Sequence, residues 1–521
     1  MEQRVRGHIL AGFRLTPVLA LLVLSGCATV NFDYPRTESS YDPDTADTYL
    51  GQRVAPSVAE HPGESAFLLQ SDGVDALGAR VVGAFHAERT IDVQYYLIKP
   101  DPIGLVFIEA LLKAADRGVR VRVLLDDVFT AGYDDAMAAL DEHPKIEIRI
   151  FNPVARGGSR LLNGLSDAGR VNRRMHNKTF IVDNQAAIIG GRNIADEYFA
   201  GRKDRNFGDL DAVVYGPIVT DLSRMFDIYW NDRLAVPIRA LVDLPEDLPA
   251  IQARLREQFE ASRKALDQTP YAEALLGSVW KLDRVGAREF DWAPYELIYD
   301  LPGKTRKEAL APEDSILTPL RKAILDAQES VLILTPYFVL QKPAFALIQE
   351  LIDRGVEIRV VTNSLASTNQ PLVHSGYAPL RKKLVEMGVK LYEVRPDAPA
   401  AGADRVQGEE AAEATMHIKA FVVDAKTVFL GSFNFDPRSA FINTESGVII
   451  DSPELGSWAV EQVNAVLAER TYELSLTDRY QLRWRTVKDG TEVIYKKDPE
   501  TTGWERFKIG FWSLLPIKNQ L

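Results

Sequence analysis

Two copies of one short motif contain the residues best suited to do chemistry. The pattern HxKxxxxD occurs in MHNKTFIVD and again in MHIKAFVVD, and a glycine-led turn ending in asparagine follows each copy. The residues are His176, Lys178, Asp183 and Asn193 in the first copy, and His417, Lys419, Asp424 and Asn434 in the second. Histidine and lysine two residues apart on a strand share one face, which places a nucleophile or acid beside a cation. That pairing suits a phosphate diester, and two copies predict one composite active site.

The aspartates of the motif are expected to act differently from the histidines. Asp183 and Asp424 follow their histidines by an odd number of residues, so on a regular strand they point to the opposite face. We interpret them as structural residues that hold the motif and its hairpin, although they belong to the catalytic signature.

The sequence around the motifs is repeated as well. Before the first motif, ALLKAADRGVRVRVLLDD has the pattern of an amphipathic helix, a turn and a buried strand, and LIQELIDRGVEIRVVTNS repeats this order before the second. The strand-like stretches IDVQYYLI and SVLILTPYFVL open the two units. The chain is therefore predicted to be a duplicated α/β fold, with a β-helix-β unit leading into each motif-bearing strand.

These motifs, together with the stretches RRMHNK, GGRN, TPYF and NTESG, resemble the phospholipase D superfamily and are most similar to bacterial cardiolipin synthases of the C type. The resemblance covers roughly residues 64 to 515. It implies a duplicated phospholipase D fold, with two pseudo-symmetric α/β lobes, mixed sheets and one shared active site. It also implies an enzyme of the phosphatidyltransferase type.

The resemblance gives the repeated residues distinct roles. His176 would attack phosphorus to form a covalent phosphohistidine, while protonated His417 would give its proton to the departing alcohol. The two lysines and the two asparagines would hydrogen-bond the non-bridging oxygens of the phosphate. No metal ion or cofactor is then expected.

Each histidine also needs an acid to orient its second nitrogen. Glu445 and Asp209 align between the two halves, because each lies eight residues before a proline that ends a strand. The family pattern crosses the pairs, with Glu445 serving His176 and Asp209 serving His417. Asp211 is the rival to Asp209.

Several substrates and activities are compatible with these motifs. The leading interpretation is a phosphatidyltransferase that makes cardiolipin from phosphatidylglycerol, with phosphatidylethanolamine as a further candidate substrate. The alternatives are a hydrolytic phospholipase D that uses water, and a nuclease of the same superfamily, which the net charge of −12 disfavours. A lipid-binding module without activity would be expected to lose motif residues, and both motifs are complete. The need for an accessory protein is left open.

The N-terminus resembles a bacterial lipoprotein signal. Arginines precede an apolar run from Leu15 to Leu24, too short to span a bilayer, and the run ends in LSGC. Cys27 is the only cysteine and is predicted to carry the lipid, with an uncleaved anchor as the alternative. The protein is expected on a membrane of the cell envelope, facing the periplasm. Ala28 favours outer-membrane sorting, whereas cardiolipin synthesis favours the inner membrane, so that choice stays open.

The predicted organisation has five parts. They are a signal peptide over 1–26, a lipidated polar tether over 27–63, a first lobe over 64–239, a connector over 240–312 and a second lobe over 313–521.

Three further features allow two interpretations each. An arginine-rich loop before the first motif could attract anionic headgroups or be a solvated loop; its arginines are Arg156, Arg160, Arg170, Arg173 and Arg174. The tail WERFKIGFWSLLPIK could lie in a membrane interface or form a packed strand and turn. His374 could serve the acceptor or be structural.

Overall fold

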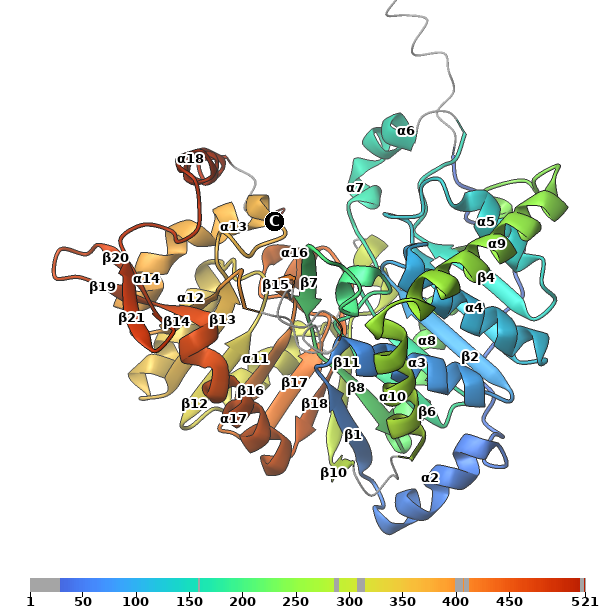
Figure 1. Ribbon diagram of the computed structural model, residues 1–521, viewed down its shortest axis with the longest axis horizontal. Helices are drawn as coiled ribbons and strands as arrows, with labels where there is room; N and C mark the ends of the chain where they lie inside the picture. The colour runs from blue at the N-terminus through green and yellow to red at the C-terminus, as the bar shows by residue number, and fades with distance from the viewer. Residues whose placement is uncertain are drawn as a thin grey trace, which may run out of the picture.

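Each motif has its own half of the molecule, and the two halves lie side by side in the computed structural model (Figure 1). The structure describes residues 29–157, 160–284, 290–306, 314–398, 406, 412–515 and 520. The signal peptide and Cys27 lie outside the described residues.

The first half is built on a mixed sheet of nine strands in the order β10-β1-β8-β6-β5-β2-β3-β4-β9. The strands are β1 (Ser65–Gln70), β2 (Thr90–Tyr95), β3 (Arg120–Asp126), β4 (Ile146–Phe151), β5 (Thr179–Val182), β6 (Ala186–Gly190), β8 (Asp211–Tyr215), β9 (Ala235–Pro237) and β10 (Asp291–Ala293). β2, β3 and β4 are parallel, and the other neighbours are antiparallel. Every residue of β2 and β5 is buried, as expected for central strands covered on both faces.

The second half repeats this plan in a sheet of ten strands, in the order β11-β18-β17-β16-β12-β13-β14-β19-β20-β21. The strands are β11 (Tyr295–Tyr299), β12 (Ser330–Leu334), β13 (Glu357–Asn363), β14 (Lys390–Val394), β16 (Ala420–Val423), β17 (Thr427–Gly431), β18 (Ser446–Asp451), β19 (Thr471–Leu476), β20 (Leu482–Lys488) and β21 (Thr491–Tyr495). β12, β13 and β14 are parallel, like β2, β3 and β4. The predicted duplicated α/β fold is confirmed.

Helices cover the sheets. They are α2 (Tyr49–Glu60), α3 (Gly73–His86), α4 (Pro102–Asp116), α5 (Asp134–Asp141), α6 (Arg160–Ser166), α7 (Ala168–Val171), α8 (Pro217–Trp230), α9 (Leu248–Asp267), α10 (Pro270–Arg284), α11 (Leu317–Leu325), α12 (Lys342–Asp353), α13 (Pro371–Tyr377), α14 (Arg381–Glu386), α16 (Pro437–Phe441), α17 (Pro453–Arg470) and α18 (Gly503–Trp512). The two DRG turns end α4 and α12 as predicted. Gly118 and Gly355 supply the left-handed conformation there, with φ of 102° and 84°.

The inner faces of the two sheets share one hydrophobic core. Side chains from β5 and β6 pack in the same cluster as side chains from β16, β17 and β18. Helix α8 adds its apolar side chains to this cluster. Because both sheets bury apolar surface in it, the shared core holds the two halves in a fixed relation.

The polar tether predicted over 27–63 is wrong where the structure describes it, from residue 29 onward. Arg36 donates to the backbone oxygen of Ala235 at 2.8 Å, and Ser39 accepts hydrogen bonds from Arg122 and Trp230. Helix α2 follows this segment. The segment binds the first half because its polar groups satisfy buried arginines of the sheet, which composition alone does not reveal.

The described residues of the connector predicted over 240–312 pack into both halves. Helix α9 packs against α4 and α5, and α10 packs against α3. The strands that follow separate, so that β10 pairs with β1 and β11 pairs with β18. The C-terminal stretch also differs from the predicted strand and turn, because it forms helix α18.

Candidate active site

Backbone pairing between the halves brings each histidine to the acid of the other half. A short parallel pair joins β7 (Arg205–Gly208) to β15 (Glu413–Met416), and the amide of His417 then donates to the oxygen of Gly208 at 2.7 Å. On the other side, the amide of His176 donates to the oxygen of Thr444 at 2.9 Å. The next residues after these two acceptors are Asp209 and Glu445. The same arrangement thus occurs twice, once for each histidine.

The side chains then meet across the boundary between the halves. His176 Nδ1 lies 2.8 Å from Glu445 Oε2, and His417 Nδ1 lies 2.6 Å from Asp209 Oδ2. All four side chains are buried. These are the crossed contacts that the family resemblance implies. A carboxylate on Nδ1 fixes the tautomer and leaves the lone pair of Nε2 for chemistry.

Asp211, the rival to Asp209, points elsewhere. Its carboxylate accepts a hydrogen bond from Arg80 at 2.9 Å and lies 3.4 Å from Arg192. Asp209 has room for its own carboxylate because residue 191 is glycine, where a Cβ would lie 2.2 Å from Asp209 Oδ1.

The corresponding residue of the second motif acts in a different way. Ser432 stands where the first motif has Gly191, and its hydroxyl donates to Glu445 Oε2. The first half therefore leaves space for Asp209 at Gly191, whereas the second half gives Glu445 a hydrogen bond from Ser432.

The two lysines hold positive charge inside this buried site. Lys178 donates to the backbone oxygen of His176 at 2.5 Å, and Lys419 donates to that of His417 at 2.5 Å. Lys419 Nζ also lies 3.2 Å from His417 Nε2. A phosphate bound between the histidines would therefore lie beside two ammonium groups, which suits the charge of a diester in the transition state.

Each of the two asparagines has one buried oxygen that accepts no hydrogen bond from the described residues. Asn193 donates through Nδ2 to the hydroxyl of Tyr198 at 2.8 Å. The Oδ1 atoms of Asn193 and Asn434 are buried, and neither finds a hydrogen-bond partner among the described residues. Buried polar atoms without partners are uncommon, so these oxygens are candidates for contact with a substrate hydroxyl.

Aromatic rings around the histidines were not found from the sequence. Tyr96 meets His176 edge to face with ring centres 5.1 Å apart, and Tyr198 meets His417 at 5.2 Å. Phe207 stacks on His417 at 5.5 Å with an interplanar angle of 14°. In the sequence, these rings are marked only by where they stand. Tyr96 directly follows β2, and Phe207 precedes Asp209 by two residues. The rings keep water away from the imidazoles.

The motif aspartates lie away from the histidines, at the far ends of their strands. Asp183 accepts hydrogen bonds from the amides of residues 88, 89 and 90, between 2.8 and 2.9 Å. Asp424 accepts from the amides of residues 328, 329 and 330 at 2.8 Å. Each carboxylate thus ties its hairpin to the start of a neighbouring parallel strand. This placement agrees with a structural part for both residues.

The electrostatics of the site follow from its burial. Desolvation lowers the pKa of both His176 and His417 to about 4, although Glu445 and Asp209 act in the opposite direction. Desolvation also lowers the pKa of Lys178 to about 7 and that of Lys419 to about 8. Near neutral pH the imidazoles of the free site are therefore neutral. The pKa values of its two lysines lie close to this pH, so a small rise in pH removes their positive charge.

A pH dependence follows from these values. The catalytic efficiency kcat/KM is expected to fall as pH rises through about 7 to 8, because Lys178 and Lys419 then lose the charge that attracts phosphate. It should also fall as pH drops toward about 4, where His176 gains a proton and loses its lone pair. A bound diester adds negative charge and raises all of these pKa values, so the alkaline limb of kcat should lie at higher pH. Equal alkaline limbs in the two profiles would contradict this electrostatic account.

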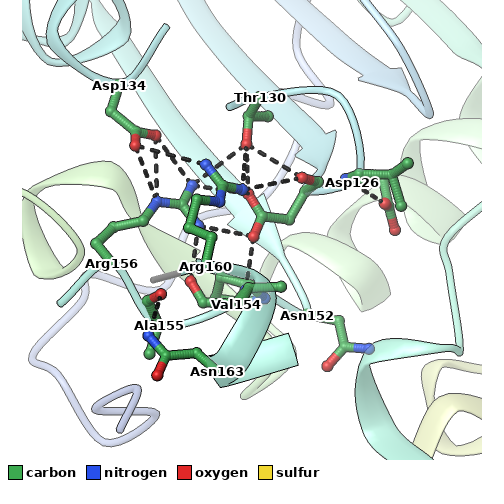
Figure 2. A network of polar contacts seen from close by, with 12 residues as sticks. Asp126, Thr130, Asp134, Asn152, Val154, Ala155, Arg156, Arg160 and Asn163 are labelled. Atoms are coloured by element: carbon green, nitrogen blue, oxygen red, sulfur yellow. Dashed lines mark hydrogen bonds and ion pairs between the residues drawn. The ribbon is translucent and has the colours of Figure 1, made fainter. Parts of the chain in front are cut away.

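The arginines of the loop before the first motif are mostly paired with carboxylates. Arg156 binds Asp127 at 2.7 Å and Asp134 at 3.0 Å, and Arg160 binds Asp127 at 3.0 Å (Figure 2). Arg170 and Arg174 pair with Asp167 and Asp126. Both interpretations of the loop therefore need correction, because only Arg173 lacks a carboxylate partner among the described residues.

His374 is not brought to the site. Its Nε2 lies 2.8 Å from Arg381 Nη2, and Arg381 also binds Glu393 and Asp498. This network is buried in the second half and joins α13 to β14. The structure places His374 in a structural network.

Among the described residues, neither a metal site nor a membrane-spanning helix is found. Nowhere in the described ranges do three or more His, Cys, Asp or Glu side chains gather in a way that could hold a metal ion. Among the helices within those ranges, none is both long and apolar enough to cross a membrane.

Comparisons with known proteins agree with the geometry. The family model described as cardiolipin synthase, PLD-like domain, matches residues 85–230 and 320–467, one segment in each half. Cardiolipin synthase C of Escherichia coli strain K12 is 36% identical over 481 residues, which cover 90% of this chain and 99% of that protein. An uncharacterized protein of Helicobacter pylori strain J99 is 34% identical over 519 residues, covering 97% and 99%.

A solved structure shows the same fold. The crystal structure of phosphatidylserine synthase from Haemophilus influenzae matches with a TM-score of 0.57 at 14% identity, covering 90% of this chain and 99% of that one. The chain belongs to the cardiolipin synthase family of phospholipase D-like phosphatidyltransferases.

Proposed function

We propose that the protein makes cardiolipin by moving a phosphatidyl group from one phospholipid to a hydroxyl of another, through a phosphohistidine on His176. The observation that supports this most is the pair of buried histidines, each held by a carboxylate from the opposite half. Such a site can run a two-step exchange in which the histidines alternate as base and acid. Phosphatidylglycerol serves as donor and acceptor, and phosphatidylethanolamine is a further candidate donor.

In the first step, Nε2 of His176 forms a bond to phosphorus, and the bond between phosphorus and the headgroup alcohol breaks. Protonated His417 gives its proton to the departing oxygen, so the alcohol leaves neutral. Lys178 and Lys419 balance the charge on the non-bridging oxygens while these bonds change. The diester charge raises the pKa of His417 in the complex, which favours the protonated form required.

In the second step, the glycerol hydroxyl of a second phospholipid enters. His417 takes its proton as the oxygen bonds to phosphorus, and the bond from phosphorus to His176 breaks. The site returns to its starting state, with a new diester formed. The exchange of one phosphate diester for another is nearly balanced in free energy, so substrate supply sets its direction.

Transfer rather than hydrolysis requires that the intermediate meets lipid more often than water. Tyr96, Phe207 and Tyr198 surround the imidazoles with apolar surface. Orientation of the acceptor can be worth several powers of ten in effective concentration. These features favour transfer, and the similarity to cardiolipin synthase C supports it.

Product analysis separates transfer from hydrolysis. Purified protein in vesicles of phosphatidylglycerol, with or without phosphatidylethanolamine, should form cardiolipin with much less phosphatidic acid, as measured by mass spectrometry of the lipids. His176→Ala serves as the blank for contaminating activity. If phosphatidic acid dominates at every acceptor density, the protein is a hydrolytic phospholipase D.

We also infer that Cys27, outside the described residues, carries a lipid that anchors the protein in the cell envelope with its body in the periplasm. Cells fed a labelled fatty acid should acylate the natural protein, while Cys27→Ser should stay an unprocessed precursor without label. Normal maturation of that variant would remove the lipoprotein assignment. Fractionation of the labelled protein would show which membrane holds it.

A further inference from the structure

Exposed apolar side chains gather on the edge where the active site lies. His176 and His417 directly precede strands whose first residues pair with the last residues of β2 and β12, so both histidines lie at the carboxyl ends of the parallel strands. Among the described residues, twelve of the 21 exposed large apolar side chains follow strand ends on this edge, lie on α18, which packs against α13, or follow α18. We call these twelve the apolar edge: Val128, Phe129, Tyr133, Leu161, Leu162, Leu165, Leu372, Phe441, Trp504, Phe507, Phe511 and Leu514.

Helix α18 presents one face of this edge. Trp504, Phe507 and Phe511 recur at helical spacing and are 64%, 61% and 55% exposed, whereas Ile509 on the opposite side is buried. A capping box between Thr502 and Glu505 fixes the start of the helix. The rings therefore point outward from a well-formed helix that is anchored by its other face.

Helix α6, in the other half, also exposes apolar side chains on its outer face. Leu161 and Leu165 are 73% and 65% exposed. On the opposite side of the helix, Arg160 binds Asp127, and Asn163 donates to the oxygens of residues 155 and 157 (Figure 2). The ion pair and hydrogen bonds on the inner face of α6 fix its orientation, so its leucines point into solvent. Figure 1 shows α6 and α18 at the same end of the molecule, one on each side of the boundary between the halves.

The chain also enters the described structure at this edge. The guanidinium of Arg170, on α7, lies 5.0 Å from the centre of the Phe32 ring, and Asp33 pairs with Arg233 near the end of α8. Cys27, proposed above to carry a lipid, precedes the first described residue by two positions. A lipid on Cys27 would therefore be attached on the same side as α6 and α18.

Positive charge lies between the two helices. Arg173 donates to the backbone oxygens of residues 304 and 441, and Arg438 donates to both oxygens of Asn172. In the described part of the chain these bonds reach only uncharged oxygens, although the chain as a whole has a net charge of −12. Two guanidinium groups that bond no carboxylate of the described residues therefore lie at the boundary between the halves, where they would attract anionic headgroups.

We propose that the apolar edge is the surface by which the protein docks on an anionic phospholipid bilayer, with α6 and α18 inserting their side chains into the interface on both sides of the active site. The proposal rests on the proposed function, because phospholipid substrates must reach the histidines from a bilayer. Aromatic and leucine side chains beside basic groups suit the headgroup boundary. A bilayer also fits two separated apolar helices on either side of the active site, whereas a protein covering both would block substrate entry.

Site-specific probes test this orientation. Because Cys27 is the only cysteine, a Cys27→Ser, His176→Ala full-length chain can carry one label at Phe511→Cys, Leu165→Cys or Phe85→Cys. Phe85 is 70% exposed but lies at the end of α3, on the opposite edge. With vesicles of phosphatidylglycerol and phosphatidylethanolamine, an environment-sensitive fluorophore at 511 and 165 should shift to shorter wavelength, and at 85 it should not.

Three results would overturn the proposal. One is an equal shift at all three positions, another is no shift at 511 and 165, and the third is a shift that grows with protein concentration without vesicles, which would indicate a second copy on this surface. Since His176→Ala is present, the readout does not depend on turnover. Inactivity of the natural protein on all phospholipids, together with the expected shifts, would therefore refute only the proposed function.

A kinetic comparison gives a second readout. Trp504→Ser combined with Phe507→Ser should lower vesicle binding by about tenfold or more. The double change removes two aromatic rings that are exposed on the protein and would be buried in the membrane interface. Turnover of a short-chain phospholipid below its micelle concentration should stay unchanged, and Phe85→Ser should bind vesicles normally. Normal vesicle binding by the double variant would contradict a docking role for α18.

Discussion

Replacement of His176 or His417 by alanine is expected to lower kcat by about 10⁴-fold or more. His176 supplies the atom that bonds to phosphorus, and His417 supplies and removes the proton, so neither step proceeds without both. The double variant should be hardly worse than either single variant, because the two groups act as one unit. The measurement is turnover of phosphatidylglycerol in vesicles, with folding checked by thermal denaturation.

His374→Ala is a useful control for these variants. It removes a buried histidine whose side chain contacts Arg381 and Tyr377 in the second half. It should lower stability and leave the turnover of the remaining folded protein near normal. Losses that simply add in the double variant of His176 and His417 would contradict a single composite site.

Neutralising the orienting acids should have the second largest effect. Glu445→Gln and Asp209→Asn keep the shape of the side chains but remove the charge that fixes each imidazole, and a loss of about 10² to 10⁴-fold in kcat is expected. The two losses should differ in kind. Asp209 serves His417, the acid, so a substrate with a good leaving group should recover much of the activity of Asp209→Asn. Glu445 serves the nucleophile, so the same substrate should help Glu445→Gln much less.

Glu413→Gln is the matched control, because Glu413 is an exposed acid on β15 that pairs with Arg205. Activity close to that of the natural protein is expected. If the good leaving group instead rescues Glu445→Gln and not Asp209→Asn, the roles of the two histidines are reversed.

The sequence predicted the parts of the fold that are repeated and locally determined. In each half, the buried strand (β2 or β12) and the DRG end of the following helix (α4 or α12) lie about 20 residues apart, and each is specified by local apolar pattern and turn glycine. The prediction failed for residues 29–63. Their partners Arg122 and Trp230 are between about 80 and 190 residues away, so no local pattern indicates that the segment is bound.

The site shows the same limit. The histidines and lysines are identified by spacing, but spacing left Asp211 beside Asp209 as an orienting acid. The contact that distinguishes them is the ion pair of Asp211 with Arg80, 131 residues away. Likewise, the paired carboxylates of the arginine loop and the rings on His417 come from separate segments. Long-range contacts of this kind depend on how the two halves pack.

The most direct test of the mechanism is to trap the covalent intermediate. A reaction with phospholipid labelled in its phosphatidyl part, quenched during turnover and digested under alkaline conditions, should give an adduct that is stable to base and labile to acid. Mass spectrometry is expected to place the adduct on His176, and His176→Ala should abolish it. An adduct on His417 that persists in His176→Ala would contradict the account.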